Sequence, residues 1–155
     1  MNGQSVSVKL NGNLIAAQVI GFDQFSDIAV VKIENDNLRP IDLSQQQNIE
    51  IGAKVFAIGN PYNVGISLSS GIISATDRHF GNPYLEIIQT DASINKGNSG
   101  GALVDERGKF LGLNISIASL SGGSDGVGFA LPSEKVIAIV EAVSYTHLRA
   151  HETHP

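Results

Sequence analysis

Cysteine is absent from this 155-residue sequence, which excludes disulfide bonds, thiol nucleophiles and cysteine-ligated zinc sites. Charged residues are scarce, at 16%, and the 15 acidic residues outnumber the 10 basic ones, which argues against a nucleic-acid-binding surface. No apolar run reaches the ~18 residues that a membrane-spanning helix needs, and no signal peptide is recognisable at the start. The 42% of hydrophobic residues, in a chain of single-domain length, indicates a globular protein with a sizeable core.

Short strands joined by turns are predicted along most of the chain, in which glycine (17 residues) is more frequent than the usual ~7%. Residues 5–10 alternate between polar and apolar side chains, Asn11–Gly12–Asn13 has the composition of a hairpin turn, and residues 14–20 follow as the return strand. Residues 28–33 are nearly all apolar, which predicts a strand buried on both faces. Further strands are predicted over residues 54–58, 66–76, 84–90, 102–104, 110–117 and 126–131. Pro132–Ser133–Glu134 predicts the start of a helix.

Three of the four histidines, His147, His151 and His154, lie in the last nine residues. His147 and His151 are four residues apart and would share one face of a helix, which leaves a metal site as one interpretation. The favoured interpretation is different, because residues 143–153 resemble the translation of a transposase sequencing-library adapter. We therefore expect residues 143–155 to be a non-native, disordered tail that breaks the helix pattern and has no function.

The stretch Asn95–Lys96–Gly97–Asn98–Ser99–Gly100–Gly101 carries the strongest chemical signal. A serine between glycines has backbone freedom and is open to a substrate carbonyl, and the amides of Gly97 and Ser99 can point at one oxyanion. The pattern also fits the nucleophile elbow of α/β-hydrolases, but an elbow requires a helix after the serine, and then an acid and a histidine. Here two predicted strands follow, split by a turn at Gly108. Asp27 precedes Ser99 and begins an apolar strand, which favours the trypsin-like order of catalytic residues.

Six motifs occur in a fixed order between residues 5 and 142: Ser26-Asp27-Ile28-Ala29-Val30, Ala57-Ile58-Gly59-Asn60-Pro61-Tyr62, Ser70-Gly71-Ile72-Ile73-Ser74-Ala75, Gln89-Thr90-Asp91-Ala92-Ser93-Ile94-Asn95, Gly97-Asn98-Ser99-Gly100-Gly101-Ala102-Leu103 and Gly126-Val127-Gly128-Phe129-Ala130-Leu131-Pro132. In this order the sequence resembles the HtrA (high-temperature requirement A) family of trypsin-like serine endopeptidases, and its bacterial envelope stress-sensing branch in particular. The resemblance implies an all-β fold with two trypsin-like barrels. Its expected parts are a partial N-terminal barrel (1–33), a linker (34–50), a complete C-terminal barrel with a short helix (51–142) and the tail (143–155).

By this resemblance Ser99 is the nucleophile, and Asp27 is the acid that orients the catalytic histidine. Gly97, Asn98 and Ser99 form the oxyanion-hole loop. Asn98 replaces the aspartate that pairs with a freed N-terminus in digestive enzymes of this fold. The resemblance therefore implies that a loop rearrangement switches the site on, with no need for N-terminal trimming.

The resemblance also implies residues that bind substrate and residues that regulate the site. The walls of the S1 pocket and the strand that pairs with substrate correspond to Ile94, Leu113, Asn114, Ile115 and Ser116. Their apolar character implies a preference for small aliphatic P1 residues, with the substrate added as a β-strand. The activation-loop cluster of the family corresponds to Tyr62, Arg78 and Gln89.

The family's histidine precedes the acid, but no histidine precedes Asp27 in this sequence. We expect that histidine a few residues before Met1, and we expect His79 to be an exposed loop residue without a catalytic role. Without an imidazole Ser99 has no general base, so the polypeptide is expected to be inactive, although its parent protease cleaves peptide bonds through an acyl-enzyme. The alternative is a non-catalytic peptide-binding or chaperone-like domain of the same fold.

The resemblance implies no metal, nucleotide or organic cofactor. The implied partners are unfolded or extended polypeptides, with no nucleic acid among them. For the intact parent it implies a periplasmic or cell-envelope location, a homotrimer, and a PDZ module beyond the C-terminus of this chain.

Overall fold

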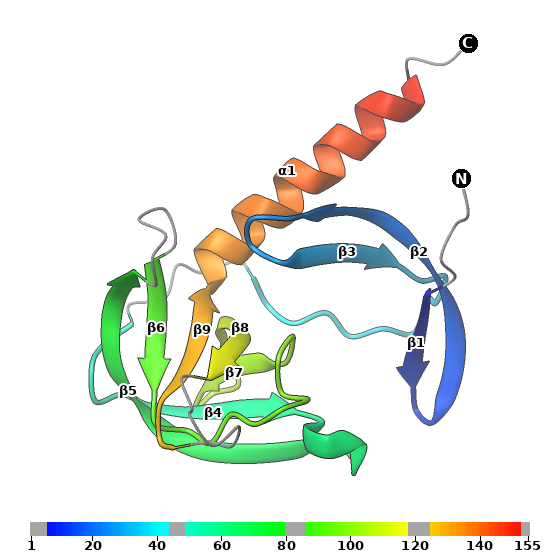
Figure 1. The fold of residues 1–155 in the computed structure, drawn as a ribbon. Coiled ribbons are helices and arrows are strands. Elements are labelled where there is room, and N and C mark those ends of the chain that lie inside the picture. The colour runs from blue at the N-terminus through cyan, green and yellow to red at the C-terminus, as the bar shows by residue number, and fades with distance from the viewer. Residues whose placement is uncertain (1–5, 44–48, 80–85, 118–124, 153–155) are drawn as a thin grey trace. The chain divides into compact units, whose positions relative to one another are not determined.

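The computed structural model of the protein describes residues 6–43, 49–79, 86–117 and 125–152 (Figure 1). These residues form, in chain order, β1 (Val6–Leu10), β2 (Asn13–Asp23), β3 (Ile28–Lys32), β4 (Lys54–Gly59), the 3-10 helix η1 (Pro61–Asn63), β5 (Ser67–His79), β6 (Glu86–Thr90), β7 (Ala102–Asp105), β8 (Phe110–Ile117), β9 (Gly128–Pro132) and α1 (Ser133–Glu152). The chain divides into two compact units. The first comprises Met1–Pro40 with Ile137–Pro155, and the second comprises Ile41–Val136.

The first unit contains an antiparallel three-stranded sheet in the order β1-β2-β3. Leu10 pairs with Asn13, and the two residues between them, Asn11 and Gly12, have φ values of 50° and 85°. Two positive φ values in a two-residue loop match the twist of the flanking strands, which confirms the predicted hairpin. The β2–β3 register shifts between Val19 and Gly21, and a Cβ on Gly21 would lie 2.8 Å from Val143 Cγ1 of α1. The helix can therefore approach β2 closely only where the side chain is missing.

The second unit is a closed antiparallel barrel in the order β4-β5-β6-β9-β8-β7. Alternate residues of β4 point inward, so that Val55 and Ala57 are buried, as a strand with one face on a core requires. The core of the barrel is formed by Val55, Ala57, Ile73, Ile88, Ala92, Ile94, Leu103, Leu111 and Ala130. Closure of the sheet leaves this barrel without a free strand edge. The all-β fold with a complete second barrel and an incomplete first one is confirmed.

Several predicted boundaries and one predicted burial pattern are wrong. β2 continues to Asp23 and β5 to His79, so His79 ends a strand instead of lying in a loop. In β3 only Ile28 is buried, and Val31 is 40% exposed, although the apolar run predicts burial on both faces. The described part of the first unit contains three strands and a stretch of helix, which are too few to cover both faces of its sheet.

The helix also extends further than its sequence pattern predicts. It runs to Glu152, where a disordered tail is expected from residue 143. The segment from Ser133 to Glu152 contains no glycine or proline, so no residue in it breaks the helix. The Thr146 hydroxyl donates to the Ala142 carbonyl at 2.9 Å, a contact that a helical residue of this type commonly makes. Within the described residues, no helix is both long and apolar enough to span a membrane.

Candidate active site

Ser99 lies in the loop between β6 and β7, and its preceding residues are anchored on the end of β4 and on η1. The Tyr62 amide donates to the Lys96 carbonyl at 3.0 Å, and the Asn60 amide donates to the Gly97 carbonyl at 3.4 Å. Gly97 has a φ of 102°, and a Cβ there would lie 2.5 Å from the Asn60 carbonyl oxygen. Glycine is therefore required at position 97 both by its backbone conformation and by the lack of space.

The residues that follow Ser99 are anchored on β8. The Gly100 amide donates to the Asn114 carbonyl at 2.7 Å, and the Asn114 amide donates to the Gly101 carbonyl at 2.8 Å. Gly100 has a φ of 83°, and a Cβ on Gly101 would overlap the Ile58 carbonyl. The loop is thus fixed on both sides of Ser99 by backbone hydrogen bonds and by glycines that no other residue can replace without strain.

Asn98, directly before Ser99, is buried, with only 4% of its surface exposed. Its amide donates to the Asn95 carbonyl at 2.9 Å, and its own carbonyl accepts from the Gly101 amide at 2.9 Å. Its side-chain Nδ2 donates to the Ser93 carbonyl at 3.4 Å, while its Oδ1 has no hydrogen-bond partner among the described residues. A neutral amide thus occupies the position that precedes the serine, and its side chain points into the protein.

Gly97 and Ser99 are exposed, in contrast to Asn98. In the described part of the chain, nothing accepts a hydrogen bond from the amides of Gly97 and Ser99, whereas the amides of Asn98, Gly100 and Gly101 are all bonded. The Ser99 hydroxyl likewise has no partner among the described residues. An accessible hydroxyl with two unpaired backbone donors beside it is the arrangement that stabilises the oxyanion formed in acyl transfer.

The loop continues into a hairpin, as the sequence predicts. β7 and β8 pair antiparallel, and Gly108 occupies the turn with a φ of 78°. The Asp105 carboxylate accepts from the amides of Arg107 and Lys109, both at 2.8 Å, which closes this turn. Because a strand follows Ser99 where an elbow would have a helix, the α/β-hydrolase interpretation is excluded.

Asp27 belongs to the first unit and is the last residue of the turn before β3. It is exposed and has a φ of 58°, in the left-handed region that aspartate tolerates better than most residues. Asp23 stabilises this turn, because its Oδ2 accepts from the Ser26 hydroxyl at 2.5 Å and from the Ser26 amide at 2.9 Å. These two hydrogen bonds lower the pKa of Asp23 below its ordinary value, since they favour the carboxylate form.

The residues expected to bind substrate lie close to the serine loop in the fold. Ile94 is 1% exposed and belongs to the barrel core. Leu113, Asn114 and Ile115 are on β8, where Leu113 and Ile115 are half-buried. Asn114 is fully buried, and its Nδ2 donates to the carbonyls of Ile58 and Ala102 at 3.3 Å each. Ser116 also belongs to β8, two residues after Asn114.

The residues expected to regulate the site are not gathered in one place. Tyr62 is exposed in η1, has a φ of 55°, and contacts the serine loop through its backbone. Gln89 lies on β6 opposite Ala75, and Arg78 is exposed three residues further along β5. Two of the three therefore lie on the β5–β6 pair, and only Tyr62 adjoins the serine loop.

His79 is not placed to act on Ser99. His79 is exposed at the end of β5, ten residues beyond Ser69, which contacts the serine loop. At about 3.3 Å per residue this is on the order of 30 Å along the strand. The side chains of His147 and His151, and all of His154, lie outside the described residues. Elsewhere, no group of three or more His, Asp or Glu side chains in the described residues could hold a metal ion.

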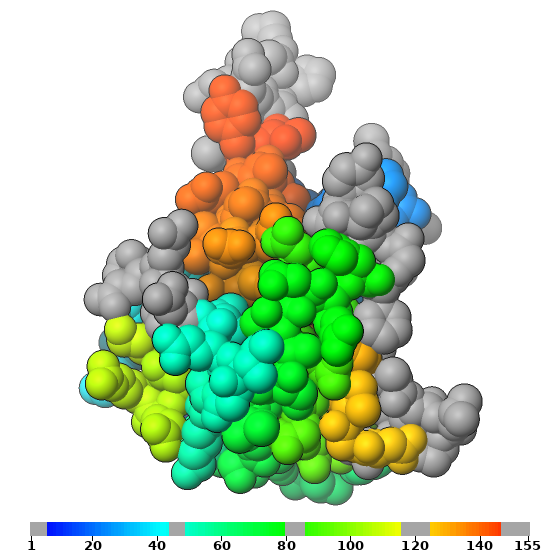
Figure 2. All heavy atoms as spheres, turned by 90° about the vertical axis from the view of Figure 1, so that its left-hand side faces the viewer, coloured from blue at the N-terminus to red at the C-terminus, as the bar shows by residue number. Residues whose placement is uncertain are grey.

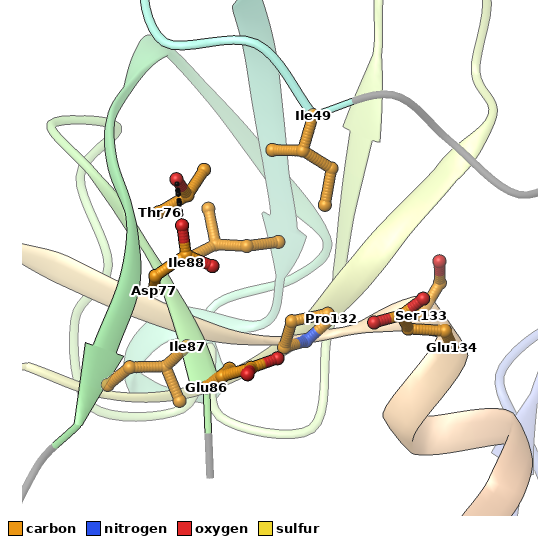
Figure 3. A pocket seen from close by; sticks show the side chains of 9 residues that line it. All are labelled: Ile49, Thr76, Asp77, Glu86, Ile87, Ile88, Pro132, Ser133 and Glu134. Carbon is orange, nitrogen blue, oxygen red and sulfur yellow. Dashed lines mark hydrogen bonds between the residues drawn. The ribbon is translucent and has the colours of Figure 1, made fainter.

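A pocket of about 240 Å³ lies near that same distant end of β5 (Figure 3). It is lined by Ile49, Thr76, Asp77, Glu86, Ile87, Ile88, Pro132, Ser133 and Glu134. Figure 2 shows the corresponding face of the barrel, with β5 and β6 in green beside the segment around residue 50 in cyan. Glu86 pairs with Lys135 at 3.7 Å, and the Thr76 hydroxyl donates to Asp77 at 3.0 Å. No residue expected to be catalytic or to bind substrate lines this pocket.

The model of the trypsin-like peptidase domain family matches residues 2–113, which include Asp27 and the whole serine loop. The chain belongs to the trypsin-like serine peptidases of the HtrA/Deg type. Its relatives include the chloroplastic Protease Do-like 1 of Arabidopsis thaliana, which is 46% identical over 132 residues, covering 81% of this chain and 30% of that protein. The periplasmic serine endoprotease DegP of Salmonella typhimurium is 44% identical over 139 residues, covering 87% of this chain and 29% of that protein.

Solved structures of the same type are also similar. The HtrA-type protease AlgW with a decapeptide has a TM-score of 0.86 and 44% sequence identity, covering 92% of this chain and 45% of that chain. AlgW with a tripeptide gives a TM-score of 0.86 and 45% identity, over 90% of this chain and 48% of that one. The resemblance to HtrA peptidases is thereby confirmed. The present chain spans less than a third of the length of the curated relatives it matches.

Proposed function

We propose that this chain is the serine endopeptidase domain of an HtrA-like quality-control protease, with Ser99 as the nucleophile and Asp27 as the acid of the triad. The observation that carries the proposal is the exposed Ser99 hydroxyl beside the unpaired amides of Gly97 and Ser99. The substrates are unfolded or extended polypeptides. The periplasmic names of several relatives support a location in the periplasm or cell envelope for the parent protein.

The reaction begins when the Ser99 Oγ attacks the carbonyl carbon of the peptide bond while a general base takes its proton. The carbonyl oxygen becomes an oxyanion, which accepts hydrogen bonds from the amides of Gly97 and Ser99. Collapse of this intermediate breaks the C–N bond, the amine leaves with the proton, and an acyl-enzyme remains on Ser99. Water then attacks the ester and releases the acid. The base is an imidazole that Asp27 orients, and this chain contains no histidine before Asp27.

The substrate binds as an extended strand beside β8, so that backbone hydrogen bonds hold it and side-chain pockets select it. Ile94 and the segment Leu113–Ser116 form the walls of the pocket for the residue before the cleaved bond. AlgW has been solved with a tripeptide and with a decapeptide, which supports peptide binding by a domain of this fold. Tyr62, Arg78 and Gln89 serve the activation of the site through loop rearrangement.

A chimeric protein tests this proposal, because the part of it that lies outside this chain supplies the general base. The segment of Escherichia coli DegP that matches this chain is replaced by residues of this chain, since 139 residues align at 42% identity. The chimera is expected to hydrolyse a denatured, fluorescently labelled protein, and its Ser99→Ala and Asp27→Asn variants are expected to lose about 10³-fold or more in kcat. Cleavage that survives Ser99→Ala would overturn the assignment of the nucleophile.

The chain by itself, with no histidine before Asp27, is expected to be nearly inert. In a fluorophosphonate reaction the Ser99 Oγ forms a bond to phosphorus, fluoride leaves, and the serine proton passes to solvent. We expect this labelling to be slower by several orders of magnitude than in a complete peptidase of the same type. Labelling of Ser99 at the rate of a complete peptidase would contradict this expectation.

The second candidate is a non-catalytic peptide-binding or chaperone-like domain. The observation that favours it is that AlgW, which has the same fold, has been solved with bound peptides. The same chimera discriminates between the two functions, because a binding module would retain unfolded protein without cleaving it. The homotrimer and the PDZ module that the resemblance implies remain predictions for the parent protein, and the mass of the assembled parent in solution tests the first of them.

A further inference from the structure

β5 lies directly against the start of the loop that leads to Ser99. The Thr90 hydroxyl donates to the Ile72 carbonyl at 2.7 Å, and the Ile72 amide donates to the Asp91 carboxylate at 2.7 Å. A Cβ on Gly71 would lie 2.6 Å from Ala92 Cα, so the two segments are in direct contact at this point. Residues 90–92 are therefore fixed to β5 by two side-chain hydrogen bonds to Ile72, next to a close backbone approach at Gly71.

Ser69 extends this attachment towards the reactive serine. Its hydroxyl donates to the Ser93 carbonyl at 2.7 Å, although the two residues are 24 positions apart in the chain. The same carbonyl accepts from Asn98 Nδ2 at 3.4 Å. The Ser93 carbonyl oxygen thus accepts a short hydrogen bond from Ser69 of β5 and a longer one from the side chain of Asn98, the residue before Ser99.

We propose that Ser69 is a positioning residue for the Ser99 loop, acting through the Ser93 carbonyl and the Asn98 side chain. Without its hydroxyl, the exposed Ser93 carbonyl can turn towards water, and the long bond from Asn98 loses its acceptor. Because Asn98 Oδ1 already has no partner among the described residues, its buried carboxamide would then be held by no hydrogen bond there. The peptide groups on either side of Asn98, which include the amides of Gly97 and Ser99, would lose their fixed orientation.

Amide hydrogen exchange in the complete 155-residue chain tests this proposal without relying on catalysis. The amides of Asn98 and Gly101 report on the loop, because both are hydrogen-bonded within it. In Ser69→Ala these two amides are expected to exchange about threefold to tenfold faster. This ratio of rates corresponds to the net free energy of one hydrogen bond. Ser69→Thr keeps the hydroxyl on a strand-favouring side chain and is expected to restore the original rates.

Ser70→Ala is the matched control, because Ser70 is the exposed neighbour on the opposite face of β5 and makes no side-chain hydrogen bond with the described residues. It is expected to leave the exchange of Asn98 and Gly101 unchanged. Unchanged exchange in Ser69→Ala would overturn the proposal. An equal rise at barrel amides such as that of Leu103 would do the same, because it would show a loss of overall stability.

A second measurement connects Ser69 with the reactivity of Ser99, and this part rests on the proposed function. Prolonged labelling with a fluorophosphonate is expected to be about threefold to tenfold slower in Ser69→Ala than in the unsubstituted chain or in Ser70→Ala. An equal labelling rate in Ser69→Ala would overturn the positioning role. If no variant reacts detectably, which agrees with the missing general base, the exchange rates alone decide the role of Ser69.

Discussion

Gly59 and Asn98 approach so closely that a Cβ on Gly59 would lie 2.7 Å from Asn98 Cα. Gly59 is the last residue of β4, and Asn98 directly precedes the reactive serine. The end of β4 therefore packs directly against the serine loop. This contact explains why a glycine ends β4, although its own φ is not in the left-handed region.

Gly59→Ala is expected to lower the free energy of unfolding by about 1–3 kcal/mol, because the added methyl group collides with a backbone atom that cannot move freely. Urea denaturation followed by circular dichroism measures this difference. Ser70→Ala, at an exposed position of β5, serves as the control and is expected to change the unfolding free energy by less than about 0.5 kcal/mol. A midpoint for Gly59→Ala that equals that of the control would contradict the tight contact.

Asn114→Ala is expected to destabilise the chain by about 2–4 kcal/mol, because the carbonyls of Ile58 and Ala102 both lose the donor that Nδ2 provides. The exchange of the Gly100 amide, which donates to the Asn114 carbonyl, is expected to accelerate more than that of distant barrel amides. Asn37→Ala is the control, since Asn37 is exposed. If Asn114→Ala unfolds at the same denaturant concentration as this control, the buried carboxamide does not hold the loop.

Asp23 is expected to make a pH-dependent contribution to stability through its hydrogen bonds from Ser26. Because its folded-state pKa lies below the ordinary value of 3.8, the unfolded state binds the proton more readily, and folding is favoured at higher pH. This contribution is complete above the unfolded pKa and is lost as the pH falls through the lower folded pKa. Carbon-detected NMR titration of the Asp23 carboxyl measures the midpoint, which is expected to rise towards 3.8 in Ser26→Ala. A midpoint that Ser26→Ala leaves unchanged would show that the Ser26 hydroxyl is not the cause.

Amide exchange is expected to show weaker protection before residue 34 than after residue 54. The first unit has a three-stranded sheet with two free edges in its described residues, whereas the second unit is a closed barrel. Residues such as Val8 should therefore exchange at least about tenfold faster than Ile88, once both rates are corrected for their intrinsic values. Equal protection of the two sheets would show that they unfold as one cooperative unit.

Local sequence patterns were sufficient to predict the strands of the barrel and the hairpin that follows Ser99. Alternation in β4 and the turn residues around Gly108 act over a few positions, so they are visible in one short window. The end of α1 is not predicted, because the resemblance of residues 143–153 to a translated adapter suggests a break, whereas the segment contains no helix-breaking residue before Pro155. The exposure of β3 is not predictable either, since an apolar run alone does not show how many other elements cover the strand.

The amino-acid sequence is sufficient to assign the HtrA-type family, the order of Asp27 and Ser99, and the glycines that give the serine loop its conformation. The tertiary structure alone decided how that loop is held, because its supports come from distant strands. Ser69 reaches Ser93 across 24 residues, and Asn114 reaches Ile58 across 56. A hydroxyl or a carboxamide in a strand gives no local signal of its partner, and only closure of the barrel brings donor and acceptor within hydrogen-bonding distance.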